Sequence, residues 1–237
     1  MTKLSVNINK LATLRNARGG NVPDLLKATK DIELFGAQGI TIHPRPDERH
    51  IRYQDARDLK NVVNTEYNIE GNPITSFIDL VLEVKPTQVT LVPDSVDVLT
   101  SNAGWDTVKH KSFLIEVIDE FKRNGIRTSV FVDPELSLIE GAALVGTDRI
   151  ELYTEDFAVG YSKGDHAVVK KYADCSLLAH QLGLGVNAGH DLSLDNIEFF
   201  KNNVPYLAEV SIGHALISEA LYQGLERVVK QYLQKLK

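Results

Sequence analysis

The chain has a single cysteine, Cys175, among its 237 residues, so it cannot form an intrachain disulfide. The surrounding sequence KKYADCSLLAHQLG has a helical pattern in which a small, packed apolar residue is the expected role for this side chain. A disulfide-stabilised secreted scaffold is therefore excluded, and we expect a reduced, cytoplasmic setting.

Long apolar runs are also missing. The amino-terminal segment MTKLSVNINK contains no continuous apolar stretch of signal-peptide length. No segment approaches the roughly 18 apolar residues that are typical of a bilayer span. We therefore expect an unprocessed, soluble protein that has no membrane partner.

Positive charge is in deficit: 26 Lys and Arg residues face 32 Asp and Glu residues, giving a formal net charge of -6. Such a balance provides no general attraction for nucleic acid or for anionic membranes, so any affinity for phosphate must be local. The apolar fraction of 43% and the charged fraction of 24% are ordinary for a globular protein.

Short β-branched runs alternate with amphipathic segments along the whole chain. The runs that predict buried strands are residues 4–8, 39–43, 66–70, 88–92, 127–132, 149–153, 185–189 and 208–213. The segments that predict helices are residues 24–35, 54–63, 75–84, 110–124, 135–144, 165–182, 193–202 and 214–236. Gly36, Gly125, Gly146 and Gly183 directly follow predicted helices, where a left-handed cap favours glycine.

Strict alternation of this kind predicts parallel strands, because each crossover helix returns the chain to the same edge of the sheet. About eight strand–helix units in a chain of this size predict a closed (β/α)₈ barrel, also called a TIM barrel. An open doubly wound sheet is the rival architecture, but no glycine-rich dinucleotide motif follows the first strand. No linker or composition shift divides the chain, so residues 1–237 are expected to form one domain.

Polar and titratable residues gather at the carboxyl ends of the predicted strands. In a parallel barrel those ends meet on one face, where active sites lie. The residues concerned are Asn7, Asn9, His43, Glu70, Glu151, His190, Gly213 and His214. Charged groups are disfavoured in buried strands unless they are paired or take part in function, so Glu70 and Glu151 need an explanation. Pairing of each carboxylate with a nearby arginine is one, but five titratable groups on one face favour a functional site.

Phosphate binding is the second inference from the sequence. The stretches NAGH (187–190) and IGHA (212–215) follow the last two predicted strands, where barrels often bind phosphate through backbone N–H groups. Arginines supply bidentate partners for phosphate oxygens. They occur in two loops, at Arg15 and Arg18 and at Arg45, Arg49 and Arg52. We therefore expect two anionic groups to be bound, with Arg49 and Arg52 as the solvated charges of the second loop.

At this point the chain resembles a known family. The segments VNINKLATLRNARGG, GITIHPRPDERHI, YNIE, TLVPD, VNAGHDL and SIGHA, in this order, are similar to the successive motifs of the pyridoxine 5′-phosphate synthase family. The resemblance runs nearly from end to end and implies a TIM barrel. It further implies a ring-closing, transferase-type synthase of vitamin B6 biosynthesis that needs neither a metal nor an organic cofactor and assembles as a homo-octamer.

The implied reaction condenses 1-deoxy-D-xylulose 5-phosphate with 3-amino-2-oxopropyl phosphate, and it yields pyridoxine 5′-phosphate, inorganic phosphate and water. By motif, His43 and Glu70 match the family's proton acceptors, and His190 matches its proton donor. The positions that match contacts to the amino ketone phosphate are Asn7, Arg18, Gly213 and His214, and Asp191 is expected to be a further substrate-binding position. Those that match contacts to the deoxyxylulose phosphate are Asn9, Lys10, Arg45, His50 and Thr100, and Glu151 matches an acidic residue of the same pocket.

The chain departs from the family pattern at two places. Asn9 and Lys10 stand where many members have Asp-His, so a phosphate contact by Lys10 is retained but proton transfer there is put in doubt. Asp191 stands where other members often have glycine, which questions a close backbone approach at this position.

The residues leave other readings open. Three histidines and two carboxylates on one rim would also suit a metal-dependent hydrolase or aldolase, although no His-x-His or His-Glu-x-x-His spacing is present. A noncatalytic barrel that binds sugar phosphates is the second alternative. Residues 94–109, which contain SNAGWD, are the candidate lid over the site, and a passive surface loop is the competing interpretation.

Overall fold

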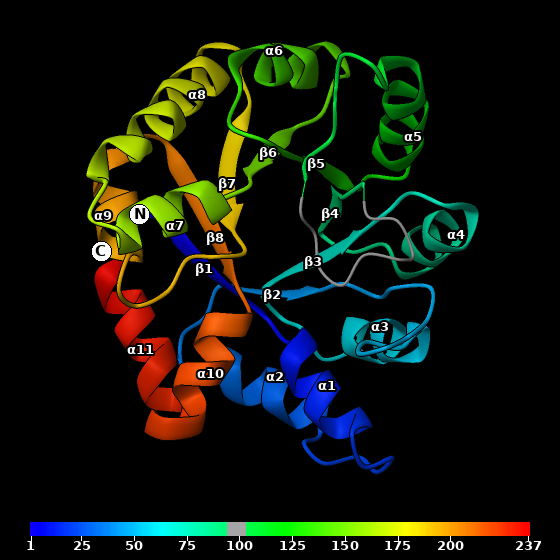
Figure 1. The fold of residues 1–237 in the computed structure, drawn as a ribbon. Helices are drawn as coiled ribbons and strands as arrows, with labels where there is room; N and C mark the ends of the chain where they lie inside the picture. The colour runs from blue at the N-terminus through cyan, green and yellow to red at the C-terminus, as the bar shows by residue number, and fades with distance from the viewer. Residues whose placement is uncertain (94–102) are drawn as a thin grey trace.

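The computed structural model describes residues 1–93 and 103–237. Every strand in these residues is parallel to its neighbours, and the strands close into a barrel in the order of the sequence (Figure 1). The strands are β1 (Lys3–Asn7), β2 (Gly39–Ile42), β3 (Glu66–Gly71), β4 (Gln88–Leu91), β5 (Arg127–Val132), β6 (Arg149–Leu152), β7 (Gly185–Gly189) and β8 (Leu207–Ile212). The (β/α)₈ architecture is therefore confirmed, and the open sheet is excluded.

Helices surround the barrel and connect its strands (Figure 1). They are α1 (Asn9–Asn16), α2 (Leu25–Leu34), α3 (Tyr53–Lys60), α4 (Thr75–Val84), α5 (Lys111–Arg123), α6 (Leu136–Leu144), α7 (Glu155–Ser162), the 3₁₀ turn η1 (His166–Val168), α8 (Val169–Gln181), α9 (Ile197–Asn203), α10 (His214–Gln223) and α11 (Leu225–Lys235). Within the described ranges, no helix is both long and apolar enough to cross a membrane.

The two faces of the barrel wall have opposite character. Outward-pointing strand residues such as Val6, Ile42 and Ile150 are fully buried and belong to the continuous apolar core beneath the helices. Inward-pointing residues are mostly polar and bond across strands, as Ser5 does to Thr41 at 2.7 Å between hydroxyl oxygens. This alternation follows from the period of two along a strand, and it gives a polar column inside the barrel.

Charged residues occupy the part of this column near the amino-terminal ends of the strands, which is called its lower part below. The Glu66 carboxylate is paired with the Arg127 guanidinium and lies 3.6 Å from the Lys3 ammonium. The Arg149 guanidinium lies 3.7 Å from a Glu209 carboxylate oxygen, and Arg149 also donates to the side-chain oxygen of Asn187 at 3.0 Å. The pairing offsets the cost of burying these charges.

Two helices in the connections were not predicted from the sequence. Segment 9–16 forms α1, whose inward positions include Ala12 and the buried Arg15, so a charged residue interrupts the apolar pattern. Segment 155–162 forms α7, of which only Phe157 is fully buried. Most of the stretch between the predicted strand ending at 153 and the predicted helix starting at 165 is therefore helical.

The predicted helix at 214–236 is divided into α10 and α11. The break lies at Gly224, whose φ of 87° and ψ of 143° are accessible mainly to glycine. The helix predicted at 193–202 begins later, at Ile197. Gly36, Gly125, Gly146 and Gly183 all have positive φ, which confirms the predicted left-handed caps.

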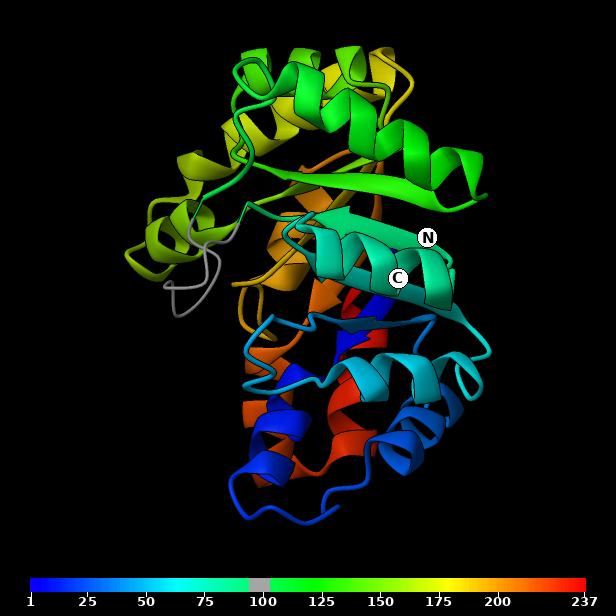
Figure 2. The same cartoon turned by 90° about the vertical axis from the view of Figure 1, so that its right-hand side faces the viewer.

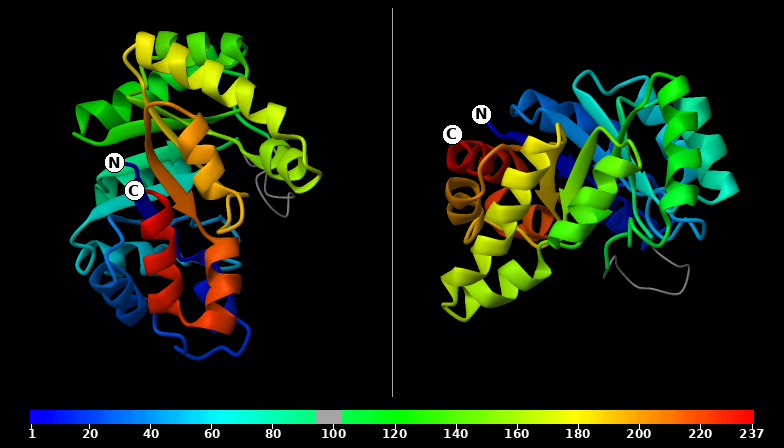
Figure 3. Two further views of the ribbon diagram at one scale, coloured as in Figure 1. Left: turned by 90° about the vertical axis from the view of Figure 1, so that its left-hand side faces the viewer. Right: turned by 90° about the horizontal axis from the view of Figure 1, so that it is seen from above.

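The strand ends define one face of the molecule. Figure 2 views the barrel from the side, and its strand arrows point toward the side on which α1 and α7 lie. Both views in Figure 3 place the two chain termini next to each other. Most of the predicted site residues follow the strands on the face toward which the arrows point.

Candidate active site

The connection from β1 to α1 brings two asparagines into the site. The Asn7 side-chain oxygen accepts the backbone N–H of Asn9 at 3.0 Å, and its amide nitrogen lies 3.4 Å from a Glu70 carboxylate oxygen. The Asn9 side-chain oxygen accepts the backbone N–H of His43 at 2.9 Å. Strands β1, β2 and β3 thus contribute to one connected group.

Gly213 closes this group on the opposite side. A Cβ atom at Gly213 would lie 3.1 Å from the Asn7 Cβ, so the glycine lets β8 approach the Asn7 side chain closely. His214 follows directly as the first residue of α10 and is exposed. The first N–H groups of a helix have no partner within the helix, so the start of α10 is suited to an anion.

His43 lies at the end of β2 and is 7% exposed. Burial lowers its pKa well below the ordinary value, and the nearby positive charge of Arg45 adds to this effect. His43 is therefore neutral at neutral pH and has a ring nitrogen able to accept a proton.

His50 lies beside His43, with 6.3 Å between the ring centroids. Burial, followed by the charge of Arg45, lowers the pKa of His50 to about 4. The backbone N–H of Ile51 donates to His50 Nδ1 at 2.9 Å, so the proton of the neutral ring lies on Nε2. His50 therefore presents a hydrogen-bond donor to whatever faces its free edge.

His190 follows β7 and has φ of 54°, a left-handed conformation that is uncommon for residues other than glycine. Its Nδ1 lies 2.9 Å from an Asp191 carboxylate oxygen, and its ring packs edge-on against Tyr153 at 5.6 Å. Because an ionised carboxylate can only accept, Nδ1 carries a proton and Nε2 faces away from Asp191.

Asp191 has its backbone occupied. Its N–H donates to the Gly189 carbonyl at 2.8 Å and lies 3.3 Å from the Thr154 hydroxyl. Because this N–H already has a partner, the geometry agrees with the expectation that the Asp191 backbone does not approach a substrate closely. The contact that its carboxylate makes is with the His190 ring, a role that the sequence pattern did not suggest.

Glu151, on β6, is 4% exposed, and burial raises its pKa to about 7, while the nearby His190 opposes the shift. None of the described residues is a hydrogen-bond partner for Glu151 Oε2. A Cβ atom at Gly189 would lie 3.2 Å from Glu151 Oε1, so the carboxyl group lies over this glycine. A buried carboxyl group that exchanges protons near neutral pH is suited to acid–base chemistry.

Two further carboxylates in the barrel were not among the predicted site residues. Glu66 and Glu209 lie in buried strands, as Glu70 and Glu151 do, and the same signal would have identified them. Burial raises the pKa of Glu209, and the nearby Glu151 adds to the rise. Asn187 on β7 is the register partner of Glu151 on β6 and of Glu209 on β8, so these three side chains line adjacent strands of the polar column.

The arginines of the two loops have different roles. Arg45 is 5% exposed and lies close enough to His43 and His50 to influence both rings. Arg18 is exposed just after α1. Arg15 was considered as an anion ligand, but that interpretation was wrong because both terminal nitrogens are taken by Asp55, at 2.6 and 2.8 Å.

The remaining predicted positions are peripheral or not described. Lys10 is exposed on α1, near enough to His50 to contribute to its lowered pKa. Thr100, together with positions 94–102 of the predicted lid, lies outside the described residues. Trp105, in the described part of the lid segment, packs at 5.4 Å from the His110 ring and donates its backbone N–H to the Phe131 carbonyl at 2.8 Å. This tryptophan therefore packs its segment against the barrel.

A metal centre was one of the alternative readings. In the parts of the chain that the structure describes, no group of three or more histidine, cysteine or acidic side chains is arranged to hold a metal ion. The site described above instead joins acid–base groups to a helix start and to buried cationic side chains.

Comparison with known proteins identifies relatives of this chain. The family model described as "Pyridoxal phosphate biosynthesis protein PdxJ" matches residues 4–237. Proteins named pyridoxine 5′-phosphate synthase from Christiangramia forsetii and Flavobacterium johnsoniae are each 72% identical to the chain over 237 residues, covering all of both sequences. The protein of that name from Cytophaga hutchinsonii is 63% identical over the same length.

Solved structures show the same fold at low sequence identity. N-(5′-phosphoribosyl)anthranilate isomerase from Pyrococcus furiosus matches with a TM-score of 0.64 and 12% identity, covering 100% of this chain and 98% of that one. A structure titled as a 4-hydroxy-2-oxoglutarate aldolase matches with a TM-score of 0.66 and 16% identity, covering 99% and 94%. At such identities the likeness concerns the barrel alone.

Proposed function

The chain belongs to the PdxJ family of pyridoxal phosphate biosynthesis, and from this we propose that it is a pyridoxine 5′-phosphate synthase. It condenses 1-deoxy-D-xylulose 5-phosphate with 3-amino-2-oxopropyl phosphate and releases pyridoxine 5′-phosphate, inorganic phosphate and water. The observation that carries the proposal is the full-length identity of 72% to proteins of that name. The geometry supports it, because the carboxyl ends of β1, β2 and β3 bring Asn7, His43 and Glu70 together.

The chemistry of the reaction requires repeated proton transfers. Joining an amine to a ketone and closing an aromatic ring also require loss of water and departure of a phosphate, and the amine belongs to the substrate. We assign proton acceptance to His43 and Glu70. The lowered pKa of His43 supports its role, since a neutral imidazole is the form that accepts a proton.

Proton donation is assigned to His190. The contact of its Nδ1 with Asp191 orients the ring, and we assign the donation to Nε2, which faces away from Asp191. Glu151, whose pKa is raised to about 7, is placed beside His190 to exchange protons during dehydration or ring closure.

Two anion sites are proposed for the two phosphates. The amino ketone phosphate is assigned to Asn7, Arg18, Gly213 and His214, a set that includes the start of α10, and Asp191 is assigned to the substrate site through its contact with His190. The deoxyxylulose phosphate is assigned to Asn9, Lys10, Arg45, His50 and Thr100. The proximity of Lys10 and Arg45 to His50 supports the second set.

We further propose that residues 1–237 act as one domain, that the protein works in the cytoplasm, and that it assembles as a homo-octamer. Strongly exposed apolar side chains support an assembly, among them Val22, Leu34, Leu221 and Tyr222, which are 72–92% exposed. Light scattering of the purified protein measures the assembly size.

The direct test of the function is an assay with purified protein, both phosphorylated substrates and no added metal. We expect the fluorescent product pyridoxine 5′-phosphate to appear together with stoichiometric inorganic phosphate, and a chelator to leave the rate unchanged. Loss of the activity with chelator would favour the metal-dependent reading. Substrate binding without turnover would favour a sugar-phosphate-binding barrel.

A further inference from the structure

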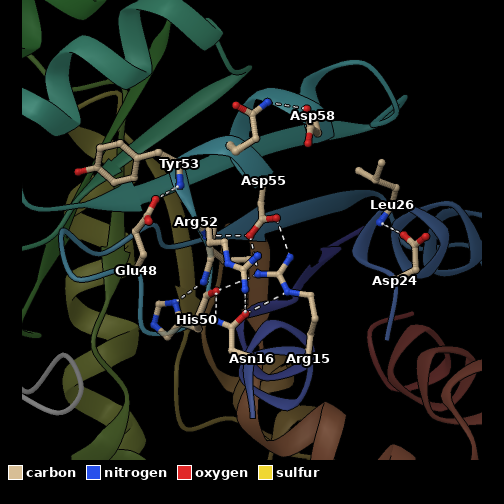
Figure 4. A network of polar contacts seen from close by, with 12 residues as sticks. Arg15, Asn16, Asp24, Leu26, Glu48, His50, Arg52, Tyr53, Asp55 and Asp58 are labelled. Atoms are coloured by element: carbon tan, nitrogen blue, oxygen red, sulfur yellow. Dashed lines mark hydrogen bonds and ion pairs between the residues drawn. The ribbon is translucent and has the colours of Figure 1, made fainter. Parts of the chain in front are cut away.

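Helix α1 is attached at both of its ends to segment 43–52, which connects β2 to α3. At the first turn, the Asn9 side chain accepts the His43 backbone N–H at 2.9 Å. At the last turn, the Asn16 amide nitrogen donates to the backbone carbonyls of His50 at 2.8 Å and Arg49 at 3.3 Å (Figure 4). The helix therefore spans the segment and fixes both of its ends.

Arg15 strengthens the second attachment. Its Nη2 donates to the His50 carbonyl at 3.2 Å, and its Nε donates to the Asn16 side-chain oxygen at 3.1 Å. The same guanidinium holds Asp55 through two hydrogen bonds, and the side chain of Arg15 is 3% exposed. A buried, bidentate arginine of this kind is rigid, because its planar fork admits one geometry.

Asp55 links the network to the next helix. Its Oδ2 also accepts the backbone N–H of Arg52 at 2.7 Å, which caps the start of α3, and Arg52 Nη2 donates to the Asn16 side-chain oxygen at 3.1 Å. Figure 4 shows Arg15, Asn16, Arg52 and Asp55 converging next to the His50 backbone. The carbonyl of His50 is thus held by two donors that belong to α1.

The segment held in this way carries Arg45 and His50. Neither Arg15 nor Asn16 is directed at a substrate. The hydrogen bonds above use both amide N–H groups of Asn16 and four of the five N–H groups of Arg15, whose side chain is 3% exposed. A shift of the His50 backbone would move the ring whose Nε2–H is the donor at the site. Small displacements of groups that position a substrate are costly for binding.

We propose that Arg15 and Asn16 are positioning residues for the deoxyxylulose phosphate end of the site, and that they act by holding the Arg49 and His50 carbonyls. The inference rests on the proposed function for the identity of the ligand. It adds two residues on α1 that stay out of contact with substrate yet determine how well Arg45 and His50 bind it.

One substitution tests the donor role of the Asn16 amide nitrogen separately from the acceptor role of its oxygen. In Asn16→Asp, the side-chain oxygen that accepts from Arg15 and Arg52 is retained, while both N–H bonds to the loop carbonyls are lost. We expect KM for deoxyxylulose phosphate to rise about tenfold or more, with kcat and KM for the amino ketone phosphate within about twofold of wild type. Asn16→Leu, which lacks the donor and the new charge, should raise the same KM.

Arg57 supplies the matched control. It holds Glu83 through two hydrogen bonds of 2.8 and 2.7 Å, joining α3 to α4, and among the described residues its guanidinium donates no hydrogen bond to segment 43–50. Arg15→Lys should raise KM for deoxyxylulose phosphate, because the ammonium retains the charge opposite Asp55 but loses the fork. Arg57→Lys should leave both KM values unchanged.

Two results would overturn the inference. One is an unchanged KM for deoxyxylulose phosphate in folded Asn16→Asp and Asn16→Leu proteins; the other is an equal rise of both KM values, which would indicate a general structural role. If wild type forms no pyridoxine 5′-phosphate, the proposed function fails instead. Calorimetric titration with deoxyxylulose phosphate then compares wild type and Asn16→Asp directly, and equal affinities would end the inference as well.

Discussion

Glu70 joins two parts of the site, since Asn7, which it contacts at 3.4 Å, also orients the start of α1. Replacing Glu70 with glutamine preserves the shape of the side chain and removes its ability to accept a proton. We predict that kcat of Glu70→Gln falls at least about a hundredfold, the usual contribution of general base catalysis. Steady-state rates measure the effect, and Glu83→Gln, on the outside of α4, is the control that should retain full activity. Wild-type turnover in Glu70→Gln would remove the residue from the mechanism.

Glu151 makes stability depend on pH. Burial raises its pKa in the folded protein to about 7 from 4.5, so between these values the folded state binds a proton that the unfolded state has lost. Its contribution to stability is therefore largest below pH 4.5 and declines as the pH rises through 7. We predict that Glu151→Gln, which cannot ionise, has a higher Tm than wild type at pH 8 and that the difference shrinks toward pH 5. Thermal melts across this range measure it, and a constant difference would contradict the assignment.

Part of the site could be predicted from individual residues. A histidine at the end of a β-branched run and a glutamate inside one are visible as departures from a buried strand, and these signals led to the prediction of His43, Glu70 and Glu151 as site residues. The role of Arg15 could not be read in this way. Whether an arginine binds a ligand or a carboxylate depends on a partner such as Asp55, which is 40 positions away in the sequence.

At the scale of elements, the alternation of strands and helices was readable because outward strand residues are apolar and recur with a period of two. The helices α1 and α7 were missed because their buried positions are few or charged, so tertiary contacts replace the apolar stripe. The mixed signal also explains why 214–236 was taken as one helix: the apolar pattern continues across Gly224, although the backbone turns there.

The turn between α10 and α11 provides an element-scale prediction. Gly224 combines φ of 87° with ψ of 143°, a conformation in which any other residue is strained by roughly 1–3 kcal/mol. We predict that Gly224→Ala lowers the free energy of unfolding by about that amount and leaves kcat unchanged. Urea denaturation measures the loss, and Gln223→Ala, at the preceding exposed position, should be close to neutral. Equal stability of Gly224→Ala and wild type would show that the turn tolerates a side chain.

At the scale of the whole molecule, the barrel interior is polar where many barrels are filled by branched apolar residues. Two of its carboxylates, Glu66 and Glu209, have Lys3, Arg127 and Arg149 as cationic neighbours, whereas the cationic group that acts on Glu151 is His190. The pairing of buried carboxylates with cationic side chains therefore decreases toward the carboxyl ends of the strands, where a carboxyl group that changes protonation is useful.

The lower ion pairs give a prediction about the interior. In Arg127→Met the Glu66 side chain, 8% exposed, retains Lys3, at 3.6 Å, as its one cationic partner among the described residues. Loss of the closer partner from this buried carboxylate should reduce the free energy of unfolding by about 3 kcal/mol. The double variant Arg127→Met, Glu66→Met should recover most of the loss. Denaturant titrations of the two single variants and the double variant measure the coupling, and additive losses would contradict the ion-pair interpretation.

The central claim is that the carboxyl ends of the strands deliver His43, Glu70 and His190 to one substrate. A crystal structure of the protein with pyridoxine 5′-phosphate and inorganic phosphate tests it most directly. The account predicts the product at the strand ends, within hydrogen-bonding distance of these three side chains, with one phosphate at the start of α10 and the other near Arg45 and His50. Product bound at the opposite end of the barrel, or away from His43 and Glu70, would contradict it.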